Sequence, residues 1–264
     1  MKNNKMTLGE FTECMQTIAP LRYAGEWDNV GLLIEPLGTH AIERVLLTID
    51  LTEDVVSEAV KMGAQAIVSY HPIMFSPIQS LSRSSHLDRT VMELVKNDIA
   101  VYSPHTALDA VPGGVNDWLA TAVGIGRIEI LQLTGDVGPG RLVGLEEPVG
   151  LKVLEGRIKE FLGLSSLRTA SASHGVKRIE RIALCAGAGG DVLRAVHADL
   201  YLTGEMRHHD VLAATQNGVH VILCEHTNSE RGYLPILAKR ITEIIRGDVQ
   251  IVTAKTDRDP FDKT

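Results

Sequence analysis

The chain has 264 residues, of which 44% are hydrophobic and 22% are charged, values that are ordinary for a soluble globular protein of one or two domains. Its formal net charge of −7 argues against nucleic acid as a partner, because surfaces that bind nucleic acid are usually basic. No apolar run approaches the roughly 20 residues needed to span a membrane. The N-terminal segment 1–15 lacks the apolar stretch of a signal peptide, so we expect a cytoplasmic protein with no membrane partner.

Strand-like apolar runs alternate with helical stretches along the chain, which predicts an α/β fold with a largely parallel sheet. Two halves of the sequence can also be laid over each other, with one extra residue in the last segment of the second copy. The matching pairs are 44–50 with 181–187, 64–72 with 198–206, and 97–109 with 217–230. We predict two similar α/β lobes, residues 1–134 and 135–264, that meet in a segment rich in glycine and proline; the alternative is chance similarity between two α/β halves.

Polar side chains recur where these predicted strands end. The residues are His71, Asp109, Glu205 and Glu230. Ligands of open α/β sheets bind outside the carboxyl ends of the strands. Histidine and carboxylate together are the ligands of zinc, manganese, iron and related divalent ions. The sequence therefore predicts a metal-binding cleft that the two lobes share.

The stretch "CEHTNSERG" (224–232) contains the sharpest of these patterns, because His226 and Glu230 are four residues apart directly after a strand. The pair would serve as metal ligands, and the spacing of His105 and Asp109 repeats the pattern in the first half. The competing interpretation is a capping box, in which Thr227 and Glu230 open a helix.

Two further motifs fit either a binding role or a structural role. Gly187 and Gly189 lie between a strand and a helix in "CAGAGGD", where backbone amides could hold an anion or substrate phosphate, or simply form a tight turn. Asp28, in "WDNVGLLI", would either hydrogen-bond a ligand or cap its turn.

Five segments taken together resemble the Nif-three-like family, whose members are also known as GTP cyclohydrolase 1 type 2 homologs. They are "WDNVGLLI" (27–34), "SYHPIMF" (69–75), "SPHTALDAVPGGVNDWLA" (103–120), "GEMRHHD" (204–210) and "CEHTNSERG" (224–232). The resemblance covers nearly the entire chain and is nearer the eukaryotic branch, which has Tyr-His-Pro. It implies two α/β lobes with a dinuclear metal site in the cleft between them, and a homohexamer.

Carried over to this chain, the family motifs imply His71, Asp109, His226 and Glu230 as ligands of two divalent ions, which would be zinc, iron or manganese. The bacterial pattern has a second histidine where this chain has Tyr70, and a protonated phenol is a poor ligand. Replacement ligands or supports for the ligands would come from three further places. They are His105, Glu205, and the pair His208–His209, and Tyr70 itself could support a ligand.

Two functions fit this site. The first is a metal-dependent hydrolase acting on a phosphorylated or nucleotide-like small molecule, with His208 or His209 as general acid or base. Nothing in the residues identifies GTP as the substrate. The alternative is a non-catalytic metal-binding scaffold, or a protein that acts by interaction with a partner.

Overall fold

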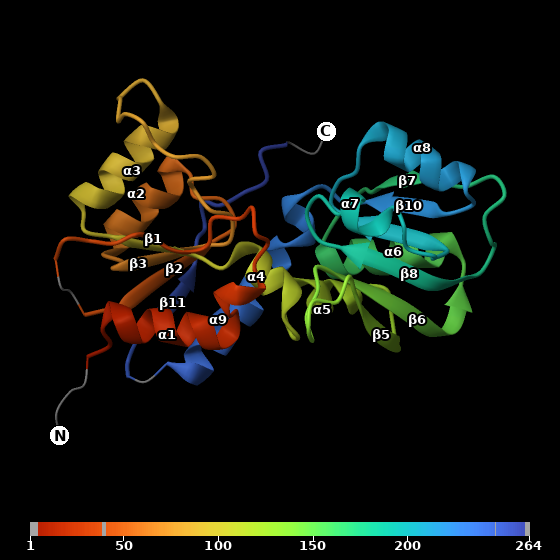
Figure 1. The fold of residues 1–264 in the computed structure, drawn as a ribbon, viewed down its shortest axis with the longest axis horizontal. Coiled ribbons are helices and arrows are strands. Elements are labelled where there is room, and N and C mark those ends of the chain that lie inside the picture. The colour runs from red at the N-terminus through yellow and green to blue at the C-terminus, as the bar shows by residue number, and fades with distance from the viewer. Residues whose placement is uncertain (1–4, 39–40, 246, 262–264) are drawn as a thin grey trace. The chain divides into compact units, whose positions relative to one another are not determined.

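The computed structural model describes residues 5–38, 41–245 and 247–261 and contains two compact α/β units (Figure 1). Unit 1 comprises Met1–Leu108 together with Leu234–Thr264, and unit 2 is Asp109–Tyr233. The predicted boundary between residues 134 and 135 differs from this division. The reason is that the last part of the chain returns to the first sheet, so unit 1 is built from two separate segments.

The sheet of unit 1 has the strand order β1-β4-β3-β2-β11. Its strands are β1 (Gly31–Ile34), β2 (Arg44–Thr48), β3 (Ala66–Ser69), β4 (Ala100–Ser103) and β11 (Gln250–Thr253). Strands β4, β3, β2 and β11 pair in parallel, and β1 pairs antiparallel with β4. Strands β3 and β4 are buried along their whole length, as expected for central strands of a parallel sheet that is covered on both faces.

Helices cover both faces of this sheet. They are α1 (Leu8–Ile18), α2 (Glu53–Met62), α3 (His86–Lys96) and α9 (Leu234–Ile244), and a short α4 (His105–Ala110) follows β4. In Figure 1, α2 and α3 lie on one face, and α1 and α9 on the other. The α2–α3 face closes over an apolar cluster that includes Leu46, Ile67 and Leu94.

Local sequence signals explain where these helices begin and end. Helix α1 starts with a capping box, in which Thr7 and Glu10 hydrogen-bond each other's backbone amides,. Helix α2 is preceded by the cap residue Thr52, whose hydroxyl accepts from the Val55 amide, and is followed by Gly63 in the left-handed conformation,.

The sheet of unit 2 has the order β5-β6-β8-β9-β10-β7. Its strands are β5 (Gly126–Leu131), β6 (Gly140–Val149), β7 (Arg168–Ala170), β8 (Ile179–Cys185), β9 (Leu200–Thr203) and β10 (His220–Leu223). Strands β8, β9 and β10 are parallel, whereas β6 and β7 run antiparallel to their neighbours β8 and β10.

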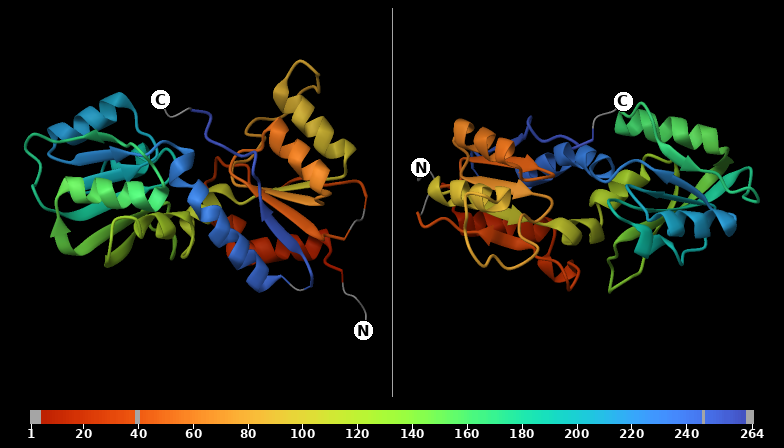
Figure 2. Two further views of the ribbon diagram at one scale, coloured as in Figure 1. Left: turned by 180° about the vertical axis from the view of Figure 1, so that it is seen from behind. Right: turned by 90° about the horizontal axis from the view of Figure 1, so that it is seen from above.

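The helices of unit 2 are α5 (Val115–Ala120), α6 (Leu151–Leu162), α7 (Gly190–Leu193) and α8 (His208–Gln216). Leu193 of α7 and Ala214 of α8 belong to an apolar cluster on one face of the sheet, and α6 lies over the opposite face (Figure 2). Within the described parts of the chain, no helix is long and apolar enough to cross a membrane.

The predicted repeat is confirmed in the topology of the two sheets. Strands β2, β3 and β4 correspond to β8, β9 and β10, and in each sheet an antiparallel strand flanks the last of the three. Because the three strands in each unit are parallel, their carboxyl ends share one edge of that sheet. The polar residues that follow the strands are gathered there.

Candidate metal-binding site

In unit 1, His71 lies two residues after β3 and is held by Asp50, which lies two residues after β2. The Nδ1 atom of His71 is 2.9 Å from Oδ1 of Asp50. A carboxylate on one ring nitrogen fixes the tautomer and orientation of the imidazole and leaves Nε2 as the ligand atom. His71 thus has the arrangement typical of a metal-binding histidine. The sequence reading missed Asp50, although its place at the end of a strand is the same signal that singled out His71.

His105 opens α4 and is supported in the same way by Asp28. Its Nδ1 lies 2.8 and 2.9 Å from the two carboxylate oxygens of Asp28, and the hydroxyl of Thr106 donates to the same carboxylate at 2.5 Å. Burial opposes the charged form of Asp28, but the hydrogen bonds from His105 and Thr106 outweigh it and lower the pKa of this carboxyl. The structure therefore places Asp28 against His105 and Thr106, where it orients the imidazole.

Tyr70 lies in the core of unit 1 beside these two histidines. It is buried, and its ring meets the imidazoles of His71 and His105 edge-on, at centroid distances of 5.1 and 5.7 Å. The carbonyl oxygen of Tyr70 accepts a hydrogen bond from the Ser103 hydroxyl. The tyrosine packs against the histidines and limits the directions in which their rings can turn.

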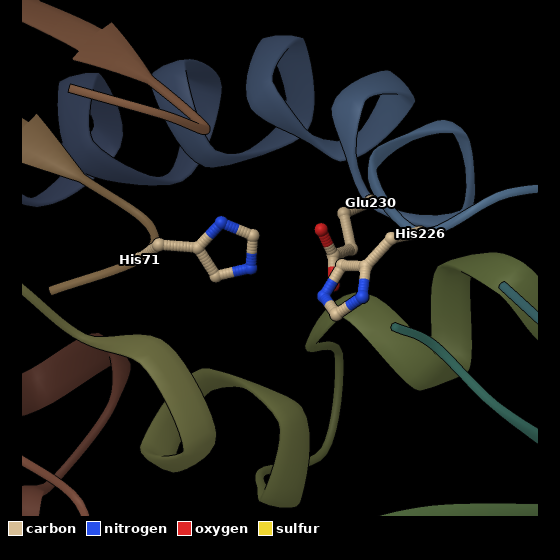
Figure 3. A group of neighbouring side chains, drawn as sticks. All are labelled: His71, His226 and Glu230. Atoms are coloured by element: carbon tan, nitrogen blue, oxygen red, sulfur yellow. The ribbon is translucent and has the colours of Figure 1, made fainter. Parts of the chain in front are cut away.

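In unit 2, His226 and Glu230 project from the segment that follows β10. The Nε2 atom of His226 is 3.3 Å from Oε1 of Glu230, and the other ring nitrogen, Nδ1, is 2.8 Å from Oε1 of Glu205. Glu205 follows β9, so its carboxylate orients His226 as Asp50 orients His71. Figure 3 shows three of the candidate ligands, His71, His226 and Glu230.

The backbone around Glu230 is not the capping box of a long helix. Two short 3-10 turns, Thr227–Ser229 and Arg231–Tyr233, follow β10, and α9 begins only at Leu234. No side chain caps the first turn. Glu230 is only 2% exposed. Its carboxylate faces His226 and does not cap a helix. Of the two readings of this motif, the geometry favours the paired acid and imidazole.

Gly187 lies against this pair. Its φ is +63°, and a Cβ atom at this position would be 2.7 Å from Oε1 of Glu230 and 3.0 Å from Nε2 of His226. The first contact is shorter than real Cβ contacts and the second is unusually tight, so a larger residue would have to displace the two side chains. Glycine suits the position through its positive φ and the space that it leaves.

The amides of the glycine loop already have partners. The Gly187 amide donates to the Ser229 hydroxyl at 2.8 Å, and the Gly189 amide donates to the Thr203 hydroxyl at 2.9 Å. Helix α7 after the loop is only four residues long. The structure therefore favours the tight turn over the predicted anion contact at Gly187 and Gly189.

Asp109 lies near the end of α4 and is braced by its neighbours in unit 2. Its carbonyl oxygen accepts from Nδ2 of Asn116, whose Oδ1 accepts from the Ala186 amide beside Gly187. Burial raises the pKa of the Cys185 thiol, and the carboxylates of Asp109 and Glu230 raise it further. Two of the expected acidic ligands thus act on the same buried thiol.

A buried cation fixes the segment that follows Asp109. Arg141 of β6 has no solvent exposure; it pairs with Asp117 and donates to the backbone carbonyls of residues 110, 111, 138 and 140. Sequence reasoning missed Arg141 because an arginine in a segment rich in glycine and proline is usually exposed.

His208 and His209 lie exposed at the start of α8, with their ring centroids 5.3 Å apart. A cavity of about 290 Å³ in unit 2 includes Glu205 in its wall. It is lined by Arg207 and Asp210, the residues on either side of the two histidines. A general acid or base at His208 or His209 remains a prediction.

A family model described as Duf34/NIF3 (NGG1p interacting factor 3) matches residues 6–260. The chain belongs to the Duf34/NIF3 family. It is 42% identical to NIF3-like protein 1 of Drosophila melanogaster, over 94% of this chain and 86% of the relative. It is 36% identical to NGG1-interacting factor 3 of Saccharomyces cerevisiae, over 92% of each chain.

Solved structures share the fold of this NIF3 family member. A Bacillus cereus protein related to NIF3 has a TM-score of 0.90 at 20% identity, and the match covers 98% of this chain and 99% of that one. A hypothetical protein of Staphylococcus aureus has a TM-score of 0.85 at 26% identity, with 99% and 100% covered. The resemblance stated from the five sequence motifs is confirmed, as are the two similar α/β lobes.

Proposed function

We propose that this NIF3 family protein binds two divalent metal ions through His71 of unit 1 and through Asp109, His226 and Glu230 of unit 2. The observation that carries the proposal is the arrangement around His226. One ring nitrogen is held by the carboxylate of Glu205, and the other faces the buried carboxylate of Glu230. In metal sites, the ring nitrogen of a histidine that does not bind the metal is typically hydrogen-bonded to a carboxylate.

The donor set suits such an ion. Imidazole nitrogen and carboxylate oxygen together select zinc, iron or manganese over calcium and magnesium, which prefer oxygen alone. Gly187 leaves open the space in front of both donor atoms, which a Cβ atom would fill.

We propose further that the protein is a hydrolase for a phosphorylated or nucleotide-like small molecule. Bound divalent ions would act as Lewis acids toward a carbonyl or phosphoryl oxygen of the substrate. Asp50 and Glu205 would hold the imidazoles of His71 and His226 in orientation. His208 or His209, exposed at the start of α8, would exchange a proton with the substrate.

The test is elemental analysis of the full chain purified without a histidine tag, beside hydrolysis assays on a panel of phosphate esters and nucleotides. We expect roughly two equivalents of transition metal per chain, and loss of both metal and turnover in Glu230→Gln. Glu180→Gln, which changes an exposed acid of the same unit, should leave both unchanged. Hydrolysis that persists undiminished in Glu230→Gln would contradict the proposal.

The second candidate is a protein that acts by interaction, and it is favoured by the name of the yeast relative, NGG1-interacting factor 3. It predicts that the protein keeps its metal yet turns over no compound in the panel. Metal-loaded protein that is inactive on every substrate, and that loses a protein partner when Glu230 is changed, would select this function.

The family resemblance also leads us to propose a cytoplasmic homohexamer. Light scattering of the full chain measures its mass directly. A monomer at micromolar concentration would contradict the hexamer and leave the metal proposal untouched.

A further inference from the structure

Two large aromatic side chains of unit 1 are exposed beside His105. Trp27 is 70% exposed and Phe75 is 58% exposed, in a chain with only two tryptophans and four phenylalanines. The ring centroid of each lies 5.9 Å from that of His105, with interplanar angles of 84° and 76°. Because both rings contact the same imidazole edge-on, their centroids can be no further apart than twice this distance.

Hydrogen bonds hold the loop that carries Trp27. The Gly25 amide donates to the Thr106 hydroxyl at 2.9 Å, and Nδ2 of Asn29 donates to the Met74 carbonyl at 2.5 Å. The second bond joins the tryptophan loop to the residue before Phe75. The two aromatic rings therefore project from loops that are tied to each other and to α4.

Gly25 sets the position of the indole. A Cβ atom on Gly25 would lie 2.9 Å from Nε1 of Trp27 and 3.2 Å from Cε2, so the indole lies close against a residue that has no side chain. His105 in turn is fixed by the carboxylate of Asp28. The aromatic surface is thus exposed to solvent and also restrained in position.

We propose that Trp27, Phe75 and His105 form a subsite for one planar heteroaromatic ring of a small-molecule substrate. Exposing an aromatic ring to water costs free energy, and stacking against a ligand ring regains part of it. Every heterocyclic base has a π-face that can stack in this way. Both rings lie 5.9 Å from the same imidazole, which places them within reach of one bound ring. The net charge of −7 argues against a nucleic-acid chain as the source of that ring.

The subsite adjoins a candidate metal ligand. The imidazole centroids of His105 and His71 are 5.3 Å apart, so a group attached to the stacked ring would lie next to His71. This step rests on the proposed function, since it gives the hydrolase a substrate class in which the ring is bound in unit 1 and its substituent is presented to the metal ligand. The binding of the ring itself rests only on the aromatic geometry.

The experiment compares two probes by titration calorimetry on the full chain, adenosine 5′-monophosphate and ribose 5-phosphate, which lacks the ring. We expect adenosine 5′-monophosphate to bind more tightly. Trp27→Ala and Phe75→Ala should each weaken it about 5- to 150-fold and leave ribose 5-phosphate unchanged. Trp27→Phe should retain most of the affinity. Phe261→Ala, which removes another exposed ring of unit 1, should have no effect.

Two further measurements separate a ring contact from a general change in the protein. In a Trp118→Phe variant the only tryptophan is Trp27, and its fluorescence should be quenched by adenosine 5′-monophosphate. Gly25→Ala should weaken the ring-bearing probe alone, because the new methyl group displaces the indole.

The outcomes distinguish this inference from the metal proposal. Metal-loaded protein that binds both probes equally would overturn the inference and leave the metal site standing. Protein that carries no metal and hydrolyses no compound of the panel, yet still binds adenosine 5′-monophosphate through Trp27, would uphold the inference while the proposed hydrolase failed. If Trp27→Ala instead lowers the mass in light scattering, the aromatic surface is a contact between copies of the chain, and the subsite is refuted.

Discussion

The two sheets share a scaffold but place their acid–imidazole pairs at different strand ends. In unit 1, Asp50 follows the first of the three parallel strands and holds His71, which follows the second. In unit 2 the pair is displaced by one strand, because Glu205 follows the second strand and holds His226, which follows the third. Gly187 lies after the first of the three strands in unit 2. It has no side chain, so the space beside Nε2 of His226 stays open.

The displacement shows what a duplicated fold conserves and what it leaves free. Both units keep the strand order and the shared edge at which polar residues meet. The chemical group at each strand end differs between the units, so the imidazole of His71 and the carboxylate of Glu205 occupy matching places. An acid in place of Gly187 would project into the donor atoms of unit 2.

The outer edges of the sheets differ as well. In unit 1, β2 pairs with the parallel strand β11 from the end of the chain, whereas in unit 2 the matching strand β8 pairs with the antiparallel β6. Strand β6 contributes the buried Arg141, whose guanidinium binds the backbone after Asp109. The comparison predicts that this edge matters to the stability of unit 2 and to the placement of a candidate ligand.

The largest expected effect comes from Arg141→Met. It leaves Asp117 and several backbone carbonyls without their buried cation, which should lower the free energy of unfolding by about 3 kcal/mol. Arg127→Met is the matched control, since Arg127 lies on the adjacent strand β5 in an exposed ion pair with Glu129 and should cost about 0.5 kcal/mol. Urea denaturation measures both. Equal losses would show that the buried arginine has no special role.

Gly187→Ala should have the next largest effect. The added Cβ would clash with Glu230 and His226, so we expect most of the metal to be lost, together with about 1–2 kcal/mol of stability from the left-handed backbone. Gly163→Ala has nearly the same φ, +65°, and meets no atom within 4 Å. It should lose similar stability and keep all its metal. Retention of metal by Gly187→Ala would break the argument for this site.

Asp50→Asn and Glu205→Gln should have smaller and matching effects. Each variant keeps the shape of the side chain and removes the charge behind a candidate ligand, which typically reduces metal affinity about 10- to 100-fold. Competition with a metal-binding dye measures the affinity of each variant. A loss in only one of them would show that the two acid–imidazole pairs are not equivalent, and that only one unit supplies an oriented histidine.

Much of this could be predicted from the sequence, because strands and their ends are local signals. The parallel strands, the repeat and the pairing of His226 with Glu230 all follow from short patterns of apolar and polar residues. The division into units could not be predicted in the same way. The pairing of β11 with β2 joins segments about 200 residues apart,, and a four-residue apolar run does not identify its partner.

Fewer features of the site than of the fold could be predicted from the sequence. Asp50 is a single acid after a strand and becomes informative only when His71 is seen against it. Arg141 reads as a surface residue, because only the folded chain reveals the carbonyls that surround its guanidinium. Thr227 and Glu230 match a capping box in spacing, yet the backbone there forms two 3-10 turns.

The return of the chain to unit 1 has a consequence for biosynthesis. On a ribosome, residues 109–233 emerge before α9 and β11, so the inserted unit can collapse while the host unit still lacks an edge strand and a helix. Until translation reaches the last few dozen residues, one side of β2 offers unpaired backbone groups to any passing strand. Pairing of β11 with β2 then satisfies those groups and completes the sheet of unit 1.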